Sequence, residues 1–409
     1  MAAGGALRST LLLAIGQAFS LFGIFLSGVL IARAFGPRTF GTYSAAFALG
    51  SLIVGGSAAG MPILILRRTS EGDIDRRTLG KALRLLLGYL VLTLAITGSL
   101  GIVLFGGGEG AIIATSAGLF FAFNNIASLG QYVHVGCRRY PRAACVGVVS
   151  GTLFPVFTFL SIRLHAGIAW CLISISIASG VSCLVAWTKL PKLEFGKIPS
   201  ALRARDSLAL NGYALLNGGY GRIDTVILLA VAGSGAAGNY SAAYRLLGPF
   251  SLISAAFAPV YFSRLSEYNH DPEAWSRVRR HGSFLFGTVS IIGMVTLFIF
   301  LPFTIHFLYG PHYGLSVGPA KILMLSLVPW ALYYLKPAAL ASVHLETRAT
   351  IALGLGLIVD FLLVIVFGRR FGATGAAWAW VASESVMYLV LRIMSRNIVN
   401  KVVGREHVV

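Results

Sequence analysis

Apolar runs of 20 residues or more recur from one end of the chain to the other, and they constrain its fold more than any other feature. A run of about 20 apolar residues is long enough to cross a hydrocarbon core of roughly 30 Å as a helix. Only 11% of the residues are charged, against about 25% in soluble globular proteins. The chain cannot present a solvated surface of the usual kind, so we predict an all-α polytopic membrane protein.

The polar breaks between these runs predict about 12 transmembrane helices. The predicted spans cover residues 10–33, 40–66, 85–105, 111–135, 143–162, 167–188, 207–232, 238–263, 283–309, 318–344, 349–368 and 372–395.

The basic residues indicate how these spans are oriented. With the N-terminus in the cytoplasm, about 24 of the 33 Lys and Arg residues fall in the termini and the even-numbered connections. Positive charge is retained on the cytoplasmic side, so both termini are predicted to be cytoplasmic. The net charge of +19 is therefore a topological signal. The basic residues are spread over short connections, so no nucleic-acid partner is expected.

An internal repeat relates the two halves of the chain. Shifted by 197 residues, Val29–Arg67 aligns without a gap on Val226–Arg264, with about 13 identities in 39 positions. The centre of the match is GTYSAAF at Gly41–Phe47 against GNYSAAY at Gly238–Tyr244. Small-residue packing motifs recur by chance in membrane helices, but this match also aligns Tyr, Pro and Arg. The offset is six spans, so we predict two like-oriented, parallel repeats.

The repeat divides the chain into two six-helix lobes, residues 1–200 and residues 201–409. Transporters built from such repeats bind their substrates at the repeat interface. We expect the two lobes to enclose a positively charged, water-accessible chamber.

Several stretches resemble one family. LIARAFGPRTFGTYSAAFALGSLI at Leu30–Ile53 is similar to the opening of the bacterial polysaccharide (O-antigen) flippases, the Wzx-type members of the MOP exporter superfamily. RIDTVILLAVAGSGAAGNYSAAYRL at Arg222–Leu246 resembles the second-lobe signature of the same family. Phe257–Glu267, Leu308–Tyr313 and Phe371–Glu384 are similar as well.

The resemblance implies a MATE-like two-lobe bundle in the bacterial inner membrane. It further implies translocation of an undecaprenyl-pyrophosphate-linked oligosaccharide, an O-antigen or exopolysaccharide repeat unit, by ion-coupled alternating access. The partners would be that lipid-linked glycan, the lipid bilayer, and the polysaccharide polymerase and chain-length machinery. No cofactor and no metal are implied.

Charges within the predicted spans are candidate functional residues, because a charge at the bilayer centre costs at least about 2.5 kcal/mol. We expect Arg222, helped by Lys336 and Arg245, to line a cationic cavity that neutralises pyrophosphate. Arginine suits this role since its planar fork binds phosphate oxygens in pairs. Lys321 is a further candidate, although near a span end it can simply extend to the interface.

Each of these charges also has a structural alternative. Asp224 and Arg245 lie within roughly 5 Å in depth at 1.5 Å per residue, so a bridge between neighbouring helices is equally expected. On one continuous helix Arg222 and Asp224 would point to different faces. Lys336 precedes Pro337, which indicates either a kink or a break that orients the amine.

Two buried carboxylates are candidates for coupling to protons or sodium. Asp360 and Glu384 lie in the last two predicted spans, and a carboxylate at membrane depth can load and unload a cation. The alternative is a structural ion pair, for instance with Lys336.

Uncharged polar groups at membrane depth complete the predicted site. They could contact sugars or hold helices together, at about 0.6 kcal/mol each. They are Asn124, Asn125, Asn211 and Asn217.

No sequence motif indicates an enzyme. Gly233–Gly238 matches G-x-G-x-x-G, but it joins two predicted transmembrane helices without a β-strand before it, so we predict a tight turn. P-loop, nucleophile-elbow and H-E-x-x-H motifs do not occur. The alternatives are a multidrug or cation antiporter of the same superfamily, a membrane enzyme of glycan assembly, and a non-transporting scaffold. An antiporter for cationic drugs would need an anionic, aromatic pocket, against which the excess of buried Arg and Lys argues.

Overall fold

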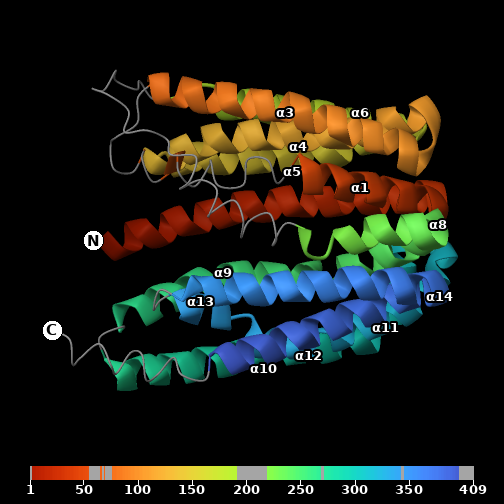
Figure 1. The fold of residues 1–409 in the computed structure, drawn as a ribbon. Helices are drawn as coiled ribbons and strands as arrows, with labels where there is room; N and C mark the ends of the chain where they lie inside the picture. Colours follow the sequence, from red (N-terminus) through yellow and green to blue (C-terminus); the bar gives the residue numbers. More distant parts are fainter. Residues whose placement is uncertain are drawn as a thin grey trace. The chain divides into compact units, whose positions relative to one another are not determined.

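The computed structural model describes residues 2–54, 65–66, 69, 76–190, 219–268, 271–341 and 345–395, and within these ranges it contains helices and no β-strand. The elements, shown in Figure 1, are α1 (Ala2–Ile53), α3 (Arg76–Phe105), α4 (Gly107–Gly136), α5 (Tyr140–Arg163), α6 (Ile168–Trp187), α8 (Ile223–Tyr244), η2 (Arg245–Leu247), α9 (Gly248–Glu267), α10 (Pro272–Tyr309), η3 (Pro311–Ser316), α11 (Val317–Leu325), α12 (Leu327–Tyr333), α13 (Lys336–Ala341) and α14 (Glu346–Met394).

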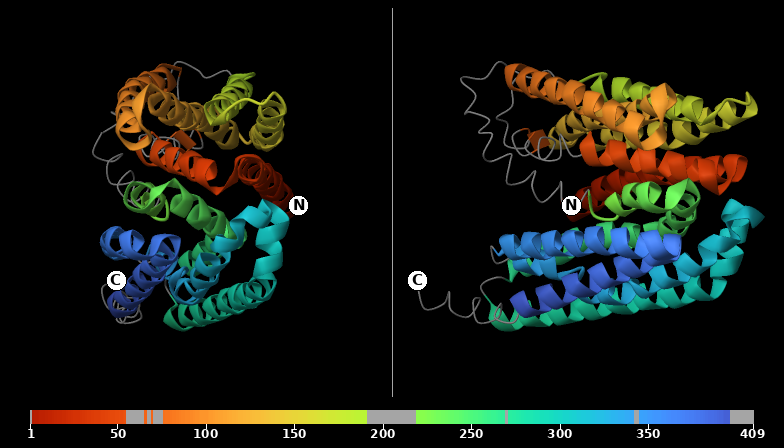
Figure 2. Two further views of the ribbon diagram at one scale, coloured as in Figure 1. Left: turned by 90° about the vertical axis from the view of Figure 1, so that its right-hand side faces the viewer. Right: turned by 45° about the vertical axis from the view of Figure 1, so that its right-hand side comes forward.

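The predicted helical membrane fold is confirmed. Within the described ranges, nine helical stretches are long and apolar enough to cross a membrane. Three of them contain a glycine with non-helical backbone angles and so consist of two helices each. The two halves of α1 and of α14 can be followed as separate rods in Figure 2. Nine stretches with three internal turns agree with about 12 spans.

Single glycines make these three turns. Gly36 has φ 74° and ψ 178°, Gly233 has φ 84° and ψ 172°, and Gly372 has φ 58° and ψ −134°. Glycine reaches these angles without a steric penalty, whereas other residues are strained there by about 1–3 kcal/mol. The G-x-G-x-x-G stretch therefore begins at a turn, as predicted.

The internal repeat recurs in the backbone and in the side chains. Gly36 and Gly233, 197 residues apart, have nearly the same angles. Tyr43 stacks on Phe47 with ring centroids 5.8 Å apart and an interplanar angle of 29°. The equivalent Tyr240 stacks on Tyr244 at 6.0 Å and 28°. Each lobe thus builds the same turn and the same aromatic pair from the same sequence pattern.

The chain forms two compact units, Met1–Val226 and Ile227–Val409. The predicted boundary after residue 200 lies outside the described residues. The first unit includes Arg222 and Asp224, which the sequence analysis placed in the second lobe.

Glycines bring α1 and α5 into close contact in the first unit. A Cβ on Gly151 would overlap the carbonyl oxygen of Phe19, and a Cβ on Gly147 would overlap that of Gly16. Gly147 and Gly151 form a G-x-x-x-G motif, which lets helix backbones approach closely in membranes. This packing depends on the absence of side chains, so it is sensitive to substitution.

We expect Gly151→Leu to destabilise the first unit by about 1–3 kcal/mol, because an added side chain would force the two backbones apart. Purified protein in detergent should unfold several degrees lower in a thermal melt. Gly88→Leu is the matched control, since a Cβ on the exposed Gly88 of α3 meets nothing within 4 Å. Equal melting temperatures for the two variants would contradict this packing.

In the second unit the predicted tenth span is interrupted twice. Its first helix, α11, ends at Leu325, four residues before Pro329, and α12 ends at Tyr333, four residues before Pro337. Proline has no N–H to donate to the carbonyl four residues earlier. Each segment therefore ends at the residue whose carbonyl loses its helical donor, and α13 then begins at Lys336. Of the kink and the break that the sequence left open before Lys336, the structure fits the kink, since Tyr334 keeps helical angles of φ −50° and ψ −36°.

Two helices begin earlier than predicted. The ninth span was predicted from residue 283, but α10 starts at Pro272, where the Asp271 carboxylate accepts a hydrogen bond from the backbone N–H of Ala274 at 2.9 Å. An aspartate N-cap followed by proline is a strong helix start. Similarly, α3 starts at Arg76 and not near residue 85. Both helices begin with a turn that contains charged residues, so apolar runs alone place their starts too late.

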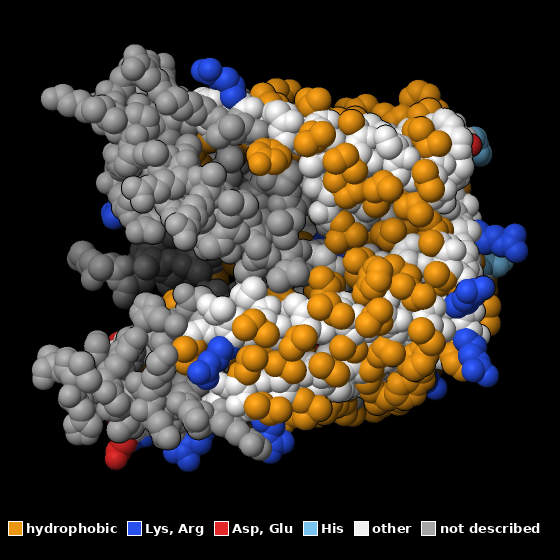
Figure 3. Space-filling model, viewed as in Figure 1, with side chains coloured by type: hydrophobic (Ala, Val, Ile, Leu, Met, Phe, Trp, Pro, Cys, Tyr) orange, Lys and Arg blue, Asp and Glu red, His pale blue; other side chains and the backbone are white. Residues whose placement is uncertain are grey.

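The surface agrees with a lipid environment. Large apolar side chains are exposed on both units, for example Val103 at 78%, Phe284 at 73% and Phe303 at 69%. In Figure 3 hydrophobic side chains cover the middle of the described helices, and most Lys and Arg lie toward the helix ends. Water could not solvate such a surface, whereas hydrocarbon can.

Candidate functional site

Three cationic side chains gather in the second unit. Lys336 begins α13, and its Nζ lies 4.6 Å from the centroid of the Tyr388 ring on α14. Arg279 of α10 and Arg392 of α14 lie close enough to Lys336 for electrostatic interaction. We call these three residues the cationic cluster.

The cationic cluster is not neutralised by carboxylates of the described residues. No acidic side chain in the described ranges forms a salt bridge with Lys336, Arg279 or Arg392. Lys336 and Arg279 are half-buried and Arg392 is exposed, and like charges repel more strongly where water is partly excluded. An anion with several oxygens would relieve this repulsion, so the cluster suits a phosphate or pyrophosphate group.

One face of the last helix positions the cluster. Trp380, Glu384, Tyr388 and Arg392 follow one another at intervals of four residues along the second half of α14, so they share a face. The Trp380 indole N–H donates to the Ser326 hydroxyl at 3.1 Å, at the first interruption of the tenth span. This contact fixes the register between α14 and the interrupted span.

Glu384 lies on α14 one helical turn before Tyr388 and has a defined partner. Its side chain is 1% exposed and accepts a hydrogen bond from the Tyr333 hydroxyl at 2.6 Å, a length typical of O–H donation to a carboxylate. Asp360 is also fully buried, in the first half of α14. The Ser383 hydroxyl joins the two halves of α14 by donating to the Gly356 carbonyl at 2.8 Å.

Arg222 lies in the first unit, against α4. Its guanidinium is 5.9 Å from the centroid of the Phe121 ring. The predicted seventh span is not continuous here, because residues 220–222 form a turn and α8 begins at Ile223. The prediction that Arg222 and Asp224 share one helix was therefore wrong. Asp224 is fully buried and accepts a hydrogen bond from the backbone N–H of Thr225 at 2.8 Å.

The predicted cavity cations share one structural property. Arg222 lies in the turn before α8, Arg245 begins the short 3₁₀ helix η2, and Lys336 begins α13. Each therefore stands next to the start of a helical element inside a predicted span. Arg245 lies near the buried Tyr309 and Tyr313. Interrupted helices at membrane depth are typical of transporter binding sites, where irregular backbone lines a cavity.

The remaining predicted site residues do not gather in one place. Asn125 donates its amide to the Val54 carbonyl at 2.8 Å, at the end of α1, whereas Asn124 and Lys321 are exposed. Asn211 and Asn217 lie outside the described residues.

Two members of the cationic cluster, Arg279 and Arg392, were not predicted as site residues. Both belong to the basic residues of the connections and termini, which served only as evidence of topology. Lys336 and Arg392 belong to helices distant in sequence, so only packing shows that they meet. The spacing of Glu384, Tyr388 and Arg392 on one helical face was the signal that could have indicated Arg392.

A comparison with known protein families matches most of the chain. The family described as polysaccharide biosynthesis protein matches residues 29–317, well over half of the chain. The chain belongs to the polysaccharide biosynthesis protein family. Its resemblance to the Wzx-type polysaccharide flippases of the MOP superfamily is thereby confirmed. No curated protein matches the sequence.

Solved structures of other proteins have the same fold as this chain. An inward-facing multidrug resistance MATE transporter has a TM-score of 0.72 at 16% identity, covering 94% of this chain and 96% of that one. The lipid II flippase MurJ, in an inward closed conformation, has 0.71 at 18%, covering 94% and 87%. A MOP superfamily transporter from Pyrococcus furiosus has 0.67 at 16%, covering 97% and 96%. The chain therefore shares its fold with these transporters.

Proposed function

We propose that the protein flips an undecaprenyl-pyrophosphate-linked oligosaccharide, an O-antigen or exopolysaccharide repeat unit, from the cytoplasmic to the periplasmic leaflet of the bacterial inner membrane by alternating access. The observation that carries the proposal is the cationic cluster at an interrupted transmembrane span, in a chain of the polysaccharide biosynthesis protein family.

The chemistry of the carrier explains the cluster. A pyrophosphate diester carries its charge on several oxygens, and the two guanidinium groups and one ammonium of the cluster can donate to more than one of them. Polar groups of the sugars need only hydrogen-bonding partners or water. The cations therefore bind the charged part of the substrate, whose transfer into hydrocarbon costs the most free energy.

Coupling to an ion gradient is assigned to Glu384 and Asp360. Both are buried carboxylates in α14, and Glu384 lies one helical turn from Tyr388, which contacts Lys336. Loading a cation on Glu384 would change the charge on the helix face that carries Tyr388 and Arg392, and so the affinity of the cluster for pyrophosphate. Coupling and substrate binding would then share one helix face.

We expect Glu384→Gln to remove the dependence of flipping on a proton or sodium gradient, since glutamine keeps a hydrogen-bonding group near Tyr333 but cannot bind a cation in the same way. The measurement is the flipping rate in vesicles with and without each gradient. Glu267→Gln, an exposed acid on α9, should leave the dependence unchanged. Flipping by the unmodified protein that is equally fast without any gradient would remove the coupling role.

Surface glycan provides a test of the function in cells. A bacterium whose own polysaccharide flippase is deleted, but which makes a compatible lipid-linked repeat unit, should regain surface polysaccharide when it produces this chain. The rival multidrug antiporter shares the fold but would instead raise resistance to cationic dyes. Dye resistance without surface glycan would reject the proposal.

A further inference from the structure

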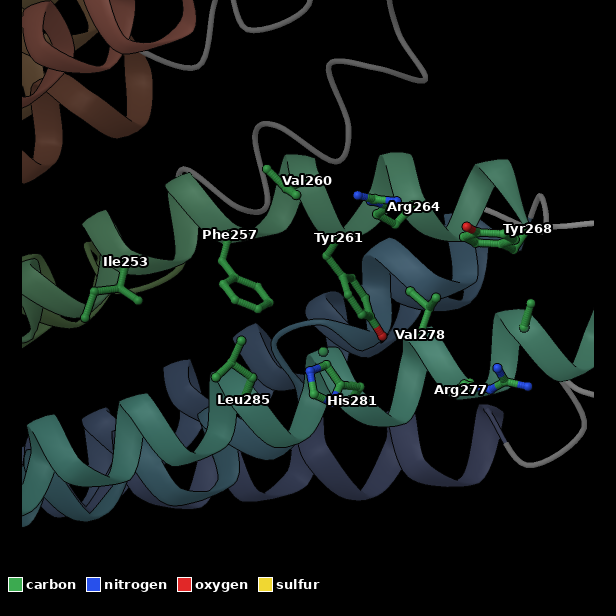
Figure 4. Close-up of a pocket in the computed structure, with 12 residues that line it drawn as sticks. Ile253, Phe257, Val260, Tyr261, Arg264, Tyr268, Arg277, Val278, His281 and Leu285 are labelled. Carbon is green, nitrogen blue, oxygen red and sulfur yellow. The ribbon is translucent and has the colours of Figure 1, made fainter. Parts of the chain in front are cut away.

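A second basic region lies in the second unit next to the cationic cluster, since Tyr261, which lines it, donates a hydrogen bond to the Arg279 carbonyl at 3.4 Å. A cavity of about 890 Å³ lies between α9 and the first half of α10, and no member of the cluster lines it. A volume of this size is typical of sites for drug-sized molecules. We call it the α9–α10 groove; its lining side chains are drawn in Figure 4.

The groove has an apolar end. Figure 4 shows Phe257 pointing from α9 toward Leu285 on α10, with Ile253 farther along α9, while Val260 lies at the outer rim of α9. Val260 is 64% exposed and Leu285 44% exposed. These side chains offer hydrocarbon to an occupant and make no hydrogen bonds to it, so they suit an alkyl chain.

The other end is basic. Arg264 on α9 and Arg277 on α10 lie toward the Tyr268 end of the groove, and His281 lies between them and Leu285 (Figure 4). Arg264 forms an exposed ion pair with Glu267 in which the nitrogen and oxygen are 4.0 Å apart. Such a pair is weak and exchangeable, so Arg264 can still bind an anion.

Charge and shape together define the occupant. The groove offers cations at one end and hydrocarbon at the other, and the connection between α9 and α10 is predicted to be cytoplasmic. A soluble anion would not need the apolar end, and a zwitterionic lipid would gain little from two arginines. Basic pockets between transmembrane helices on the cytoplasmic side bind anionic lipid headgroups.

We propose that the α9–α10 groove binds an anionic phospholipid of the cytoplasmic leaflet, with its phosphate at the basic end that carries Arg264 and Arg277 and an acyl chain along Phe257 and Leu285. This site is separate from the flippase proposal, because it holds a resident lipid and not the transported glycan.

Lipid binding to the purified full chain in detergent tests the proposal by native mass spectrometry. Phosphatidylglycerol should bind at least about 10-fold more tightly than phosphatidylcholine of the same acyl chains, since each basic residue near the phosphate adds several-fold. The double variant R264Q/R277Q should lose this preference. Arg280→Gln, an exposed arginine of α10 that does not line the groove, should keep it.

A second variant addresses the apolar end. Val260→Trp should fill the groove and weaken the binding of phosphatidylglycerol and of phosphatidylcholine alike. Val260 is exposed, so the protein should still fold with this substitution. Equal affinities for the two lipids, or an unchanged preference in R264Q/R277Q, would overturn the proposal. Undecaprenyl phosphate that binds more tightly than phosphatidylglycerol and displaces it would also overturn it, since the groove would then be a carrier site.

Discussion

Lys336→Gln is expected to slow the flipping of lipid-linked oligosaccharide about 10–100-fold while the protein still inserts and folds. The variant removes the central charge of the cationic cluster, and a lost hydrogen bond to a charged partner costs about 1.5–3 kcal/mol. Lys336 is half-buried at the start of α13, so glutamine fits in its place. The measurement is the initial rate of flipping in reconstituted vesicles.

Two controls separate this effect from a loss of structure. Lys189→Gln makes the same chemical change at an exposed lysine between α6 and the next predicted span, and it should flip at the normal rate. Lys336→Arg keeps the charge and should retain most of the activity. A normal rate for Lys336→Gln would exclude the cluster from substrate binding.

Arg222→Ala is expected to abolish flipping, with a decrease of at least about 100-fold. We propose that Arg222 binds phosphate oxygens in pairs, and alanine leaves neither the charge nor the planar fork. Arg222→Lys should recover only part of the rate, since lysine restores the charge without the fork. Membrane insertion and the melting temperature should be close to those of the unmodified protein.

The chain offers a matched control for this variant as well. Arg163 also lies over an aromatic ring, that of Phe159 at 5.1 Å, but it is exposed at the end of α5. Arg163→Ala loses the same kind of cation–π contact and should keep normal activity. Normal glycan export in Arg222→Ala would show that its charge serves packing against Phe121 and not the substrate.

Much of the fold could be predicted because its determinants are local. Apolar runs define where the spans are, and the sequence predicted both the repeat and the turn at Gly233, to which the turn at Gly36 is equivalent. The interruptions of the tenth predicted span also have a local cause, in Pro329 and Pro337. Hydropathy alone does not detect them and predicts one continuous span. The same analysis missed the turn at residues 220–222, where Gly221 has a φ of 79°.

The candidate site was harder to predict because it depends on which helices are neighbours. Hydropathy and the positive-inside rule assign each charge to a span or to a connection. They do not show that Arg279 and Arg392 approach Lys336, or that the partner of Glu384 is Tyr333 on a different span. Those contacts follow from the packing of α12 and α13 against α14, and of α10 against α12, in the second unit.

The most direct test of the central claim is flipping by the purified protein. The full chain is reconstituted into vesicles with an undecaprenyl-pyrophosphate-linked oligosaccharide in both leaflets, and a membrane-impermeant glycosidase reports how fast the inner pool becomes accessible. The unmodified protein should expose that pool, and Lys336→Gln should do so about 10–100-fold more slowly. An inner pool that stays protected, as in protein-free vesicles, would contradict the account.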